Sequence, residues 1–202
     1  MPGILVIAEP NEGGIAPVSF ELIAAARQLS SEGAGNVTAL IAGSEADAQQ
    51  LIAHGADAAI AATNPALKAG LGEAYLPAVQ AAIESSGADI VLMGQTSLGR
   101  DLGPALAFAN KTAVAMDCVA LAIAGGRLRA TRSAYGGNAR AEVTWKAPLQ
   151  VATVKAKSFD ALEADSARSG SVSTSDAGAD PKVKVLGVSK AEIGRASCRE
   201  RV

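Results

Sequence analysis

Residues 89–107, DIVLMGQTSLGRDLGPALA, decide the fold of this chain. The run 90–93 is continuously apolar, as in a strand buried on both faces, and a glycine-rich turn follows it. The residues after the turn have the spacing of a helix. A buried strand that passes through a short turn into a helix is the repeating unit of a parallel α/β sheet.

The same alternation of strand and helix occurs four times in the first 111 residues. Short joints separate the predicted elements, which favours a parallel sheet with right-handed crossovers. The expected fold is therefore α/β, with a Rossmann-like parallel sheet. Strands are predicted at 3–8, 36–42, 58–62 and 89–94, and helices at 18–29, 45–54, 73–86 and 98–111.

The pattern changes after residue 113, where helical spacing gives way to β-like runs separated by turns. Gly125-Gly126 and Gly136-Gly137-Asn138 are typical of hairpin turns. We therefore expect the parallel core to be extended by antiparallel strands. The runs are 114–124, 127–135, 139–145 and 150–155.

The C-terminal part has a different composition. Residues 161–181 are rich in Ser, Ala, Asp and Gly, which predicts a flexible linker or surface loop, and 182–188 has the pattern of one more strand. We expect an N-terminal α/β domain at 1–160 and a linker with a strand at 161–193, leading to a second domain that is absent. The stretch 194–202, GRASCRERV, is expected to be a foreign tail, the alternative being an ordinary frayed terminus.

Composition excludes several classes of function. The net charge of −2 gives no reason to expect nucleic-acid binding, and no apolar run approaches the roughly 18 residues that span a bilayer. The N-terminus lacks the pattern of a secretory signal. Two cysteines and one histidine provide no disulfide framework and no metal site. The expectation is a soluble, cytoplasmic protein.

The turn after residue 93 is the first candidate site. It matches neither the Walker loop nor the GxGxxG dinucleotide fingerprint. In one interpretation, backbone N–H groups of residues 96–99 and Arg100 hold a phosphate at the helix N-terminus. In the other, Thr96 or Ser97 caps the helix while Arg100 and Asp101 form surface pairs. The residues of this possible nucleotide loop are Gly94, Gln95, Thr96, Gly99 and Arg100.

The sequence offers little for catalysis. His54 is the only histidine and has no partner that spacing can identify, so no Ser/His/Asp triad is predicted. Cys118 lies in an apolar run and is expected to be a small core residue. Glu9, Glu12 and Glu21 have no matching acid or base. We therefore do not expect hydrolytic chemistry.

Four arginines, at 127, 129, 132 and 140, surround the turn that begins at Tyr135. Alternation along a strand places Arg127 and Arg129 on one face. They form either a solvated face that protects a sheet edge or a surface for a partner or nucleotide. Trp145 is expected to anchor packing.

Several of these segments together resemble the electron transfer flavoprotein alpha subunits. The matching segments run in order from about residue 4 to residue 188. They are ILVIAE (4–9), IAPVSFELIAAARQL (15–29), GQTSLGRDLGPALA (94–107), RSAYGGNARAEVTW (132–145) and VATVKAKSFDA (151–161).

The resemblance implies a first domain of the adenine-nucleotide hydrolase type that forms a heterodimer with a beta subunit. It implies an electron carrier of the bacterial cytoplasm, and not an enzyme, in which a second alpha-subunit domain binds most of the FAD. Electrons would pass from flavin dehydrogenases, such as acyl-CoA dehydrogenases, to a quinone reductase. The expected interface residues are Arg129, Arg132, Tyr135, Asn138 and Trp145.

The chain also departs from the family pattern. The family's FAD domain is expected to begin at the position that residues 194–202 occupy, so no FAD is expected for this chain alone. In addition, Ala105 replaces an arginine of the family motif. The resemblance implies an empty alpha-subunit nucleotide pocket, except that in bifurcating relatives this domain borders a second flavin in the beta subunit. The alternative is a stand-alone adenine-nucleotide binder resembling universal stress proteins.

Overall fold

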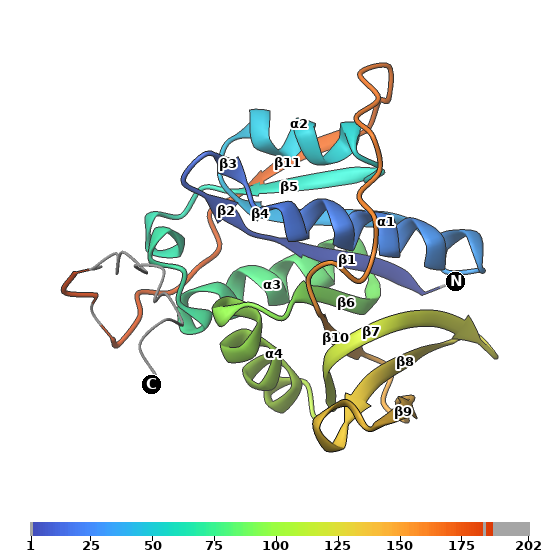
Figure 1. Cartoon of the computed structure of the whole chain (residues 1–202). Coiled ribbons are helices and arrows are strands. Elements are labelled where there is room, and N and C mark those ends of the chain that lie inside the picture. Colours follow the sequence, from blue (N-terminus) through green and yellow to red (C-terminus); the bar gives the residue numbers. More distant parts are fainter. Residues whose placement is uncertain (1, 184, 188–202) are drawn as a thin grey trace, which may run out of the picture.

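The structure is a computed structural model that describes residues 2–183 and 185–187. Figure 1 shows a single large sheet with helices on both faces. The elements are β1 (Gly3–Ala8), β2 (Pro10–Asn11), β3 (Gly14–Ile15), α1 (Pro17–Ser31), β4 (Val37–Ala42), α2 (Glu45–Ala53), β5 (Ala58–Ala62), η1 (Pro65–Ala69), α3 (Gly72–Ser86), β6 (Ala88–Gly94), α4 (Ser97–Ala109), β7 (Val114–Ala124), β8 (Arg127–Ala134), η2 (Tyr135–Gly137), β9 (Ala139–Val143), β10 (Gln150–Val154) and β11 (Ser171–Ser175).

Within the described residues this sheet has nine strands in the order β11-β5-β4-β1-β6-β10-β7-β8-β9, and β2 and β3 form a separate two-stranded antiparallel sheet. All neighbours from β11 to β7 are parallel, whereas β8 is antiparallel to both β7 and β9. The predicted α/β fold, a parallel sheet extended by antiparallel strands, is thus confirmed. None of the helices in the described part of the chain is long and apolar enough to cross a membrane.

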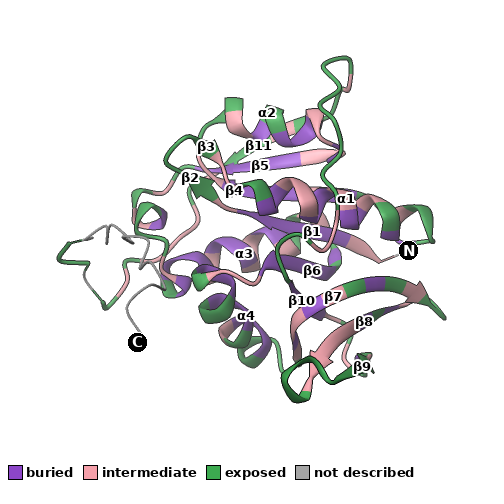
Figure 2. Cartoon of the chain, viewed as in Figure 1, coloured by how far each residue is buried: buried purple, intermediate pink, exposed green. Residues whose placement is uncertain are grey.

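Two apolar cores lie on the two faces of the sheet. Ile4 and Val6 of β1 pack on the face covered by α1 and α2, and Leu5 and Ile7 pack on the face covered by α3 and α4. Burial on both faces explains why β1 is a continuous apolar run and not an alternating one. Figure 2 shows the buried residues concentrated along the central strands.

The chain changes direction within the sheet at β1. From β1 it proceeds through β4 to β5 on one side, and it then returns to add β6 on the other side. The loops that leave β1 and β6 therefore diverge and leave a crevice between them. Such a switch point is where open α/β sheets place their ligands.

The antiparallel extension consists of β7, β8 and β9, at the lower edge in Figure 1. One of its faces belongs to the core, through Cys118, Leu121, Leu128 and Ala130. The last predicted run of this region behaves differently, because β10 lies between β6 and β7 and is parallel to both. All five residues of β10 are buried, which makes it a strand of the parallel core.

The segment expected to be a linker or loop contains a strand that the sequence did not predict. Residues 155–170 cross the molecule, and β11 then pairs in parallel with β5 at the far edge of the sheet. Only Val172 of β11 packs on the apolar core, so the backbone pairing, rather than an apolar face, defines this strand.

Two other expectations concern the C-terminal region. Residues 182, 183 and 185–187 are not in a strand, although one was predicted at 182–188. Residues 184 and 188 and the proposed tail at 194–202 lie outside the described residues. The domain boundary at 160 and the assignment of the tail remain predictions.

Candidate functional site

Thr96 organises the turn between β6 and α4. Its hydroxyl accepts a hydrogen bond from the Gly99 backbone N–H at 3.1 Å and donates one to Glu9 Oε1 at 2.7 Å. The first bond caps the helix, as one of the two sequence interpretations proposed. The second fixes a carboxylate from the end of β1 in front of the same helix end.

The glycines of this turn allow very close backbone packing. A Cβ atom on Gly99 would lie 1.9 Å from the carbonyl oxygen of Gly94, so the turn has no room for any other residue there. A Cβ atom on Gly94 would lie 3.2 Å from Glu9 Oε1. The turn is therefore pressed against the carboxyl end of β1.

Gln95 is bonded to the neighbouring strands. Its backbone N–H donates to the Val154 carbonyl at 2.8 Å, and its Oε1 accepts from the Thr153 hydroxyl and from the Asp117 N–H. Asp117 has a φ of 60°, where the ladder between β7 and β10 is irregular. Gln95 thus connects the turn to β10 and β7.

Arg100 and Asp101 have different environments. The Arg100 side chain is exposed, and neither of the two ion pairs found in the described part of the chain includes it. Asp101 Oδ2 accepts a hydrogen bond from the Gly72 N–H at 3.0 Å, at the start of α3. Asp101 therefore joins α3 to α4 rather than forming a surface ion pair.

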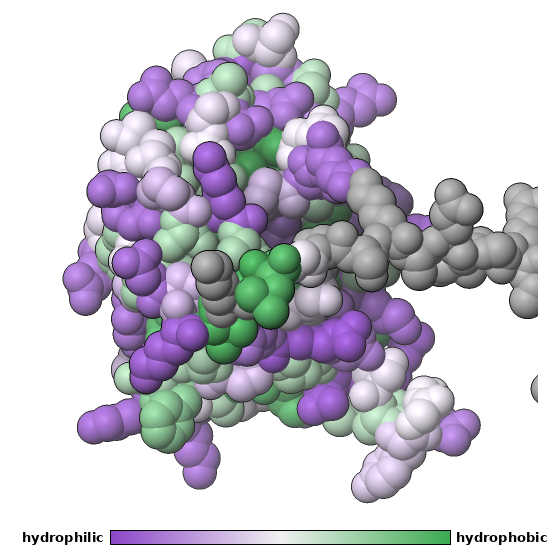
Figure 3. Space-filling view, turned by 90° about the vertical axis from the view of Figure 1, so that its left-hand side faces the viewer, coloured by the Kyte–Doolittle hydropathy of each residue, from purple (hydrophilic) through white to green (hydrophobic). Residues whose placement is uncertain are grey.

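A cavity of about 360 Å³ opens beside this turn at the switch point, and we call it the switch-point cavity. Figure 3 looks onto this edge of the sheet, where hydrophilic side chains surround smaller hydrophobic areas. The cavity is lined by residues of the β1 loop, η1, α3 and α4, namely Glu9, Pro10, Leu67, Lys68, Ala69, Gly70, Tyr75, Thr96, Ser97 and Leu98.

Two titratable groups of this cavity are strongly affected by burial. Burial raises the pKa of Glu9, and the hydrogen bond from Thr96 partly offsets that rise. Burial, together with the charge of Glu9, raises the pKa of Tyr75 to about 12, so its hydroxyl stays protonated at neutral pH. The Tyr75 side chain is 1% exposed, and its hydroxyl has no hydrogen-bond partner among the residues that the structure describes.

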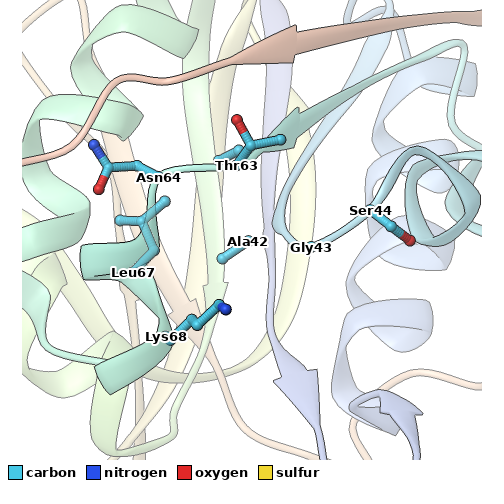
Figure 4. A pocket seen from close by; sticks show the side chains of 8 residues that line it. Ala42, Gly43, Ser44, Thr63, Asn64, Leu67 and Lys68 are labelled. Carbon is cyan, nitrogen blue, oxygen red and sulfur yellow. The ribbon is translucent and has the colours of Figure 1, made fainter.

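A second cavity, of about 300 Å³, lies at the carboxyl ends of β4 and β5. Figure 4 shows Leu67 and Lys68 projecting from η1 toward Ala42 at the end of β4. Leu67 and Lys68 line both cavities. Ser44 also lines this one, but its hydroxyl already forms a capping box with Asp47. Lys68 is the one cation that both cavities share.

The residues considered for catalysis are not brought together. His54 packs on Phe20 with 4.1 Å between ring centroids, and its Nδ1 is 2.8 Å from the Leu162 carbonyl oxygen. Cys118 is buried, and burial raises the pKa of its thiol to about 12. Glu21 accepts a hydrogen bond from the Lys157 N–H at 2.6 Å. Glu12 lies in the exposed loop between β2 and β3.

The five expected partner residues occupy two different places on the extension. Arg129 pairs with Glu142 at 3.0 Å on the exposed face. Tyr135 is 86% exposed in η2, and Asn138 Nδ2 closes this turn by donating to the Tyr135 carbonyl at 3.0 Å. These three residues form an exposed group at the tip and outer face of the extension.

Arg132 and Trp145 lie together on the core face and line a cavity of about 150 Å³, which we call the Arg132 cavity. Trp145 is buried, as expected of a packing anchor, and its Nε1 donates to the Ala113 carbonyl at 2.7 Å. The Nε of Arg132 is buried, and no described residue forms a hydrogen bond with it. Leaving such a donor unpaired costs about 1–3 kcal/mol, more for a charged group.

Charge is distributed unevenly along the chain. Residues 125–157 hold seven of the eighteen Lys and Arg residues but only one of the twenty acidic residues, Glu142. The extension itself, residues 114–143, carries four arginines against Asp117 and Glu142, so it is basic although the whole chain carries a net charge of −2. A basic region on an acidic chain attracts an acidic partner surface.

The sequence did not identify Tyr75 or Lys68 as residues of a cavity. Tyr75 fits the apolar spacing of α3, which predicts its burial but not the direction of its hydroxyl. Lys68 lies in η1, a short segment for which no element was predicted. To predict from the sequence that either residue lines the cavity, one would need to know that η1 folds back over the carboxyl ends of β1 and β6. In the described residues, no group of three acidic, histidine or cysteine side chains forms a metal site.

Comparison with known proteins identifies relatives of the kind that the sequence motifs resemble. A family model described as Electron transfer flavoprotein domain matches residues 4–180. Electron transfer flavoprotein subunit alpha of Bacillus subtilis (strain 168) is 34% identical over 175 residues, covering 86% of this chain and 53% of that protein. The protein of the same name from Megasphaera elsdenii is 36% identical, covering 84% of this chain and 52% of that protein.

A third relative has a different name. It is the Lactate dehydrogenase (NAD(+),ferredoxin) subunit LctC of Acetobacterium woodii, which is 35% identical over 165 residues, covering 80% of this chain and 40% of that protein. The chain spans about half the length, or less, of the curated relatives that it matches.

Proposed function

The chain belongs to the electron transfer flavoprotein family, and we propose that it is the part of an alpha subunit that pairs with a beta subunit. The observation that carries this proposal is the charge of residues 125–157, from β8 to just past β10, where seven basic residues accompany a single acidic one. Tyr135, at the tip of the extension, is 86% exposed, and an exposed aromatic beside arginines is typical of a protein interface. The antiparallel extension thus offers a partner surface.

In the complete protein, we propose, this subunit carries electrons through FAD from flavin dehydrogenases to a quinone reductase. The subunit would act as an electron carrier and not as an enzyme with its own substrate. FAD would supply the redox chemistry. The names of the alpha-subunit relatives support the carrier role.

The described residues do not fit FAD at the switch-point cavity. A pyrophosphate needs free N–H donors and a positive helix end. At α4 the Gly99 N–H is bonded to Thr96, and the carboxylate of Glu9 stands beside it. An ionised Glu9 would repel a pyrophosphate bound at this helix end. We therefore propose that FAD binds outside the described residues and that the turn at 94–100 has a structural role.

The test is to co-express this chain with its cognate beta subunit and to purify the complex through a tag on the chain. We expect a stoichiometric complex by size-exclusion chromatography, with no flavin absorption near 450 nm contributed by the chain. Failure of the two chains to co-purify would contradict the proposed pairing.

The visible spectrum of the same complex answers a second question. A colourless complex supports pairing without a flavin at this domain. A yellow complex would indicate a flavin held by the beta subunit next to this domain, as in the bifurcating relatives, and would contradict the purely structural role of the turn.

A second candidate function is adenine-nucleotide binding by the chain itself. The observation that favours it is the pair of cavities that share Lys68, together with the unpartnered hydroxyl of Tyr75. Calorimetry with AMP and ATP tests it, with Lys68→Met as the matched variant. Tight binding that Lys68→Met removes would support this function, and the absence of heat at millimolar nucleotide would exclude it.

A further inference from the structure

We propose that Arg132 anchors the interface by receiving a carboxylate side chain of the beta subunit in the Arg132 cavity. This inference rests on the proposed pairing and adds the residue and the chemical group that hold the two chains together. It assigns the anchoring contact to Arg132 and not to the exposed arginines of the same extension.

The position of Arg132 on β8 is unusual for a cation. Strand alternation places it on the same face as Leu128 and Ala130, both of which are buried in the core. Its cross-strand neighbours are Cys118 on β7 and Ala141 on β9, neither of which carries a charge that could balance it at neutral pH. The guanidinium therefore lies at the edge of the apolar core face of β8.

Residues 2–183 and 185–187 provide no acceptor for this guanidinium. In the described part of the chain, Arg132 takes part in no ion pair or side-chain hydrogen bond, and its Nε is buried and unpaired. The other arginines of β8 are occupied, because Arg127 donates to the Ala147 carbonyl at 2.9 Å and Arg129 pairs with Glu142. Asp117, the acidic residue next to Cys118, forms no ion pair with Arg132.

A carboxylate is the group that fits this position. A guanidinium presents a planar set of donors that matches the two oxygens of a carboxylate. The cavity of about 150 Å³ has room for the end of one acidic side chain. Trp145 and Val143 line the same cavity and would shield the pair from water. The basic surroundings favour an acidic rather than a neutral partner group.

Burial distinguishes the expected effect of Arg132 from that of its neighbours. Truncating one partner of a desolvated charge pair weakens binding strongly, whereas exposed charges at the rim mainly affect the association rate. Arg132 should therefore control the lifetime of the complex. Arg140, which is exposed on β9, is the matched control within the same extension.

The experiment measures the Kd for the beta subunit by calorimetry with the full chain and three variants. We expect Arg132→Met to weaken binding about 100-fold or more, Arg132→Lys about 10-fold, and Arg140→Met by no more than about 3-fold. The melting temperature of each isolated variant is recorded as well. Because Arg132→Met removes an unpaired buried donor, its melting temperature should be equal to or above that of the wild type.

The carboxylate is tested by charge exchange. Arg132→Glu is combined in turn with Lys substitutions at surface Asp and Glu residues of the beta subunit. Recovery of affinity with one of these substitutions would identify the acidic partner. If no acidic position restores binding, the proposed carboxylate is wrong.

Different outcomes distinguish a wrong anchor from a wrong pairing. If the wild-type chain binds the beta subunit and Arg132→Met binds equally well, the anchor is wrong and the proposed pairing stands. If the wild-type chain does not bind, the pairing itself is wrong. A loss of binding in Arg132→Met with a collapsed melting temperature would also overturn the anchor if Arg132→Lys, folded, bound like the wild type.

Discussion

Gly99 lies where β6, its turn and the first turn of α4 meet, and only a hydrogen atom fits between its Cα and the Gly94 carbonyl. The close approach lets Thr96 reach both the helix N-terminus and Glu9. The absence of a Cβ atom at Gly99 therefore determines how closely β1 and β6 are joined to α4.

We expect Gly99→Ala to destabilise the fold by about 3 kcal/mol or more, because the added Cβ would lie 1.9 Å from a backbone oxygen that cannot move independently. The melting temperature should fall by roughly 6–12 °C. Gly13→Ala is the matched control, since nothing lies within 4 Å of its Cβ position. Equal melting temperatures for the two variants would show that the turn is not packed as described.

The pKa of Glu9 predicts a pH dependence of stability. Burial raises this pKa above its ordinary value of 4.5, so the folded chain binds the proton more tightly than the unfolded chain. The contribution of Glu9 to stability is therefore present below the unfolded pKa and is lost as the pH rises through the folded pKa.

The variant Glu9→Gln does not titrate and keeps an acceptor for Thr96. Its melting temperature, relative to that of the wild type, should increase between pH 4 and pH 7 in thermal denaturation. Glu84→Gln, which changes an exposed residue of α3, should show no such trend. A constant difference for Glu9→Gln across this range would contradict the buried environment of Glu9.

At the scale of elements, β10 and β11 show how the chain completes its sheet. β10 is inserted between β6 and β7, so the region expected to be purely an antiparallel addition also contributes a central parallel strand. β11 returns to the opposite edge and covers β5, whose residues Ala59 and Ala61 are fully buried.

This pairing predicts slow amide exchange in a segment whose composition is that of a linker. We expect the amides of β11 that bond to β5 to exchange at least about 10-fold more slowly than those of an unstructured chain, because exchange requires the strand to open. Hydrogen exchange followed by mass spectrometry measures this directly. Exchange at the rate of an unstructured peptide throughout 171–175 would show that β11 does not form in solution.

At the scale of the whole molecule, the basic residues of the extension gather at one end of the sheet, opposite the end formed by β11. The field of the extension should speed the encounter with an acidic partner, and salt should weaken this effect. Such steering acts on the association rate and leaves the fold unaffected.

We expect Arg140→Glu to reduce the rate constant for association with the beta subunit about 3- to 10-fold in low salt, and less at high ionic strength. The measurement is stopped-flow or surface-based kinetics at two salt concentrations. Arg168→Glu, next to β11 in the chain, carries the same change of charge at the other end of the sheet and should have a smaller effect. Equal effects of both variants would mean that only net charge matters.

Much of the fold was predictable because it depends on local patterns. The buried strands β1, β4 and β6 are short apolar runs, and each is followed by a helix whose apolar spacing is clear. The β11 strand was not predictable, because Ser171–Ser175 has no apolar face and is held by backbone bonds to β5. The role of Gln95 was also not predictable from the sequence, because its partners Thr153 and Asp117 are distant in sequence.

Sequence patterns were enough to predict the α/β class, four strands and four helices in the first 111 residues, the antiparallel extension and the family, because each of these rests on short-range spacing or on order along the chain. The folded chain was needed to show that Glu9 lies at the start of α4, that β10 enters the middle of the sheet, and that the Nε of Arg132 is buried with no partner among the described residues. Those features depend on contacts between segments far apart in sequence. Burial by such distant segments then affects the protonation and pairing of the side chains.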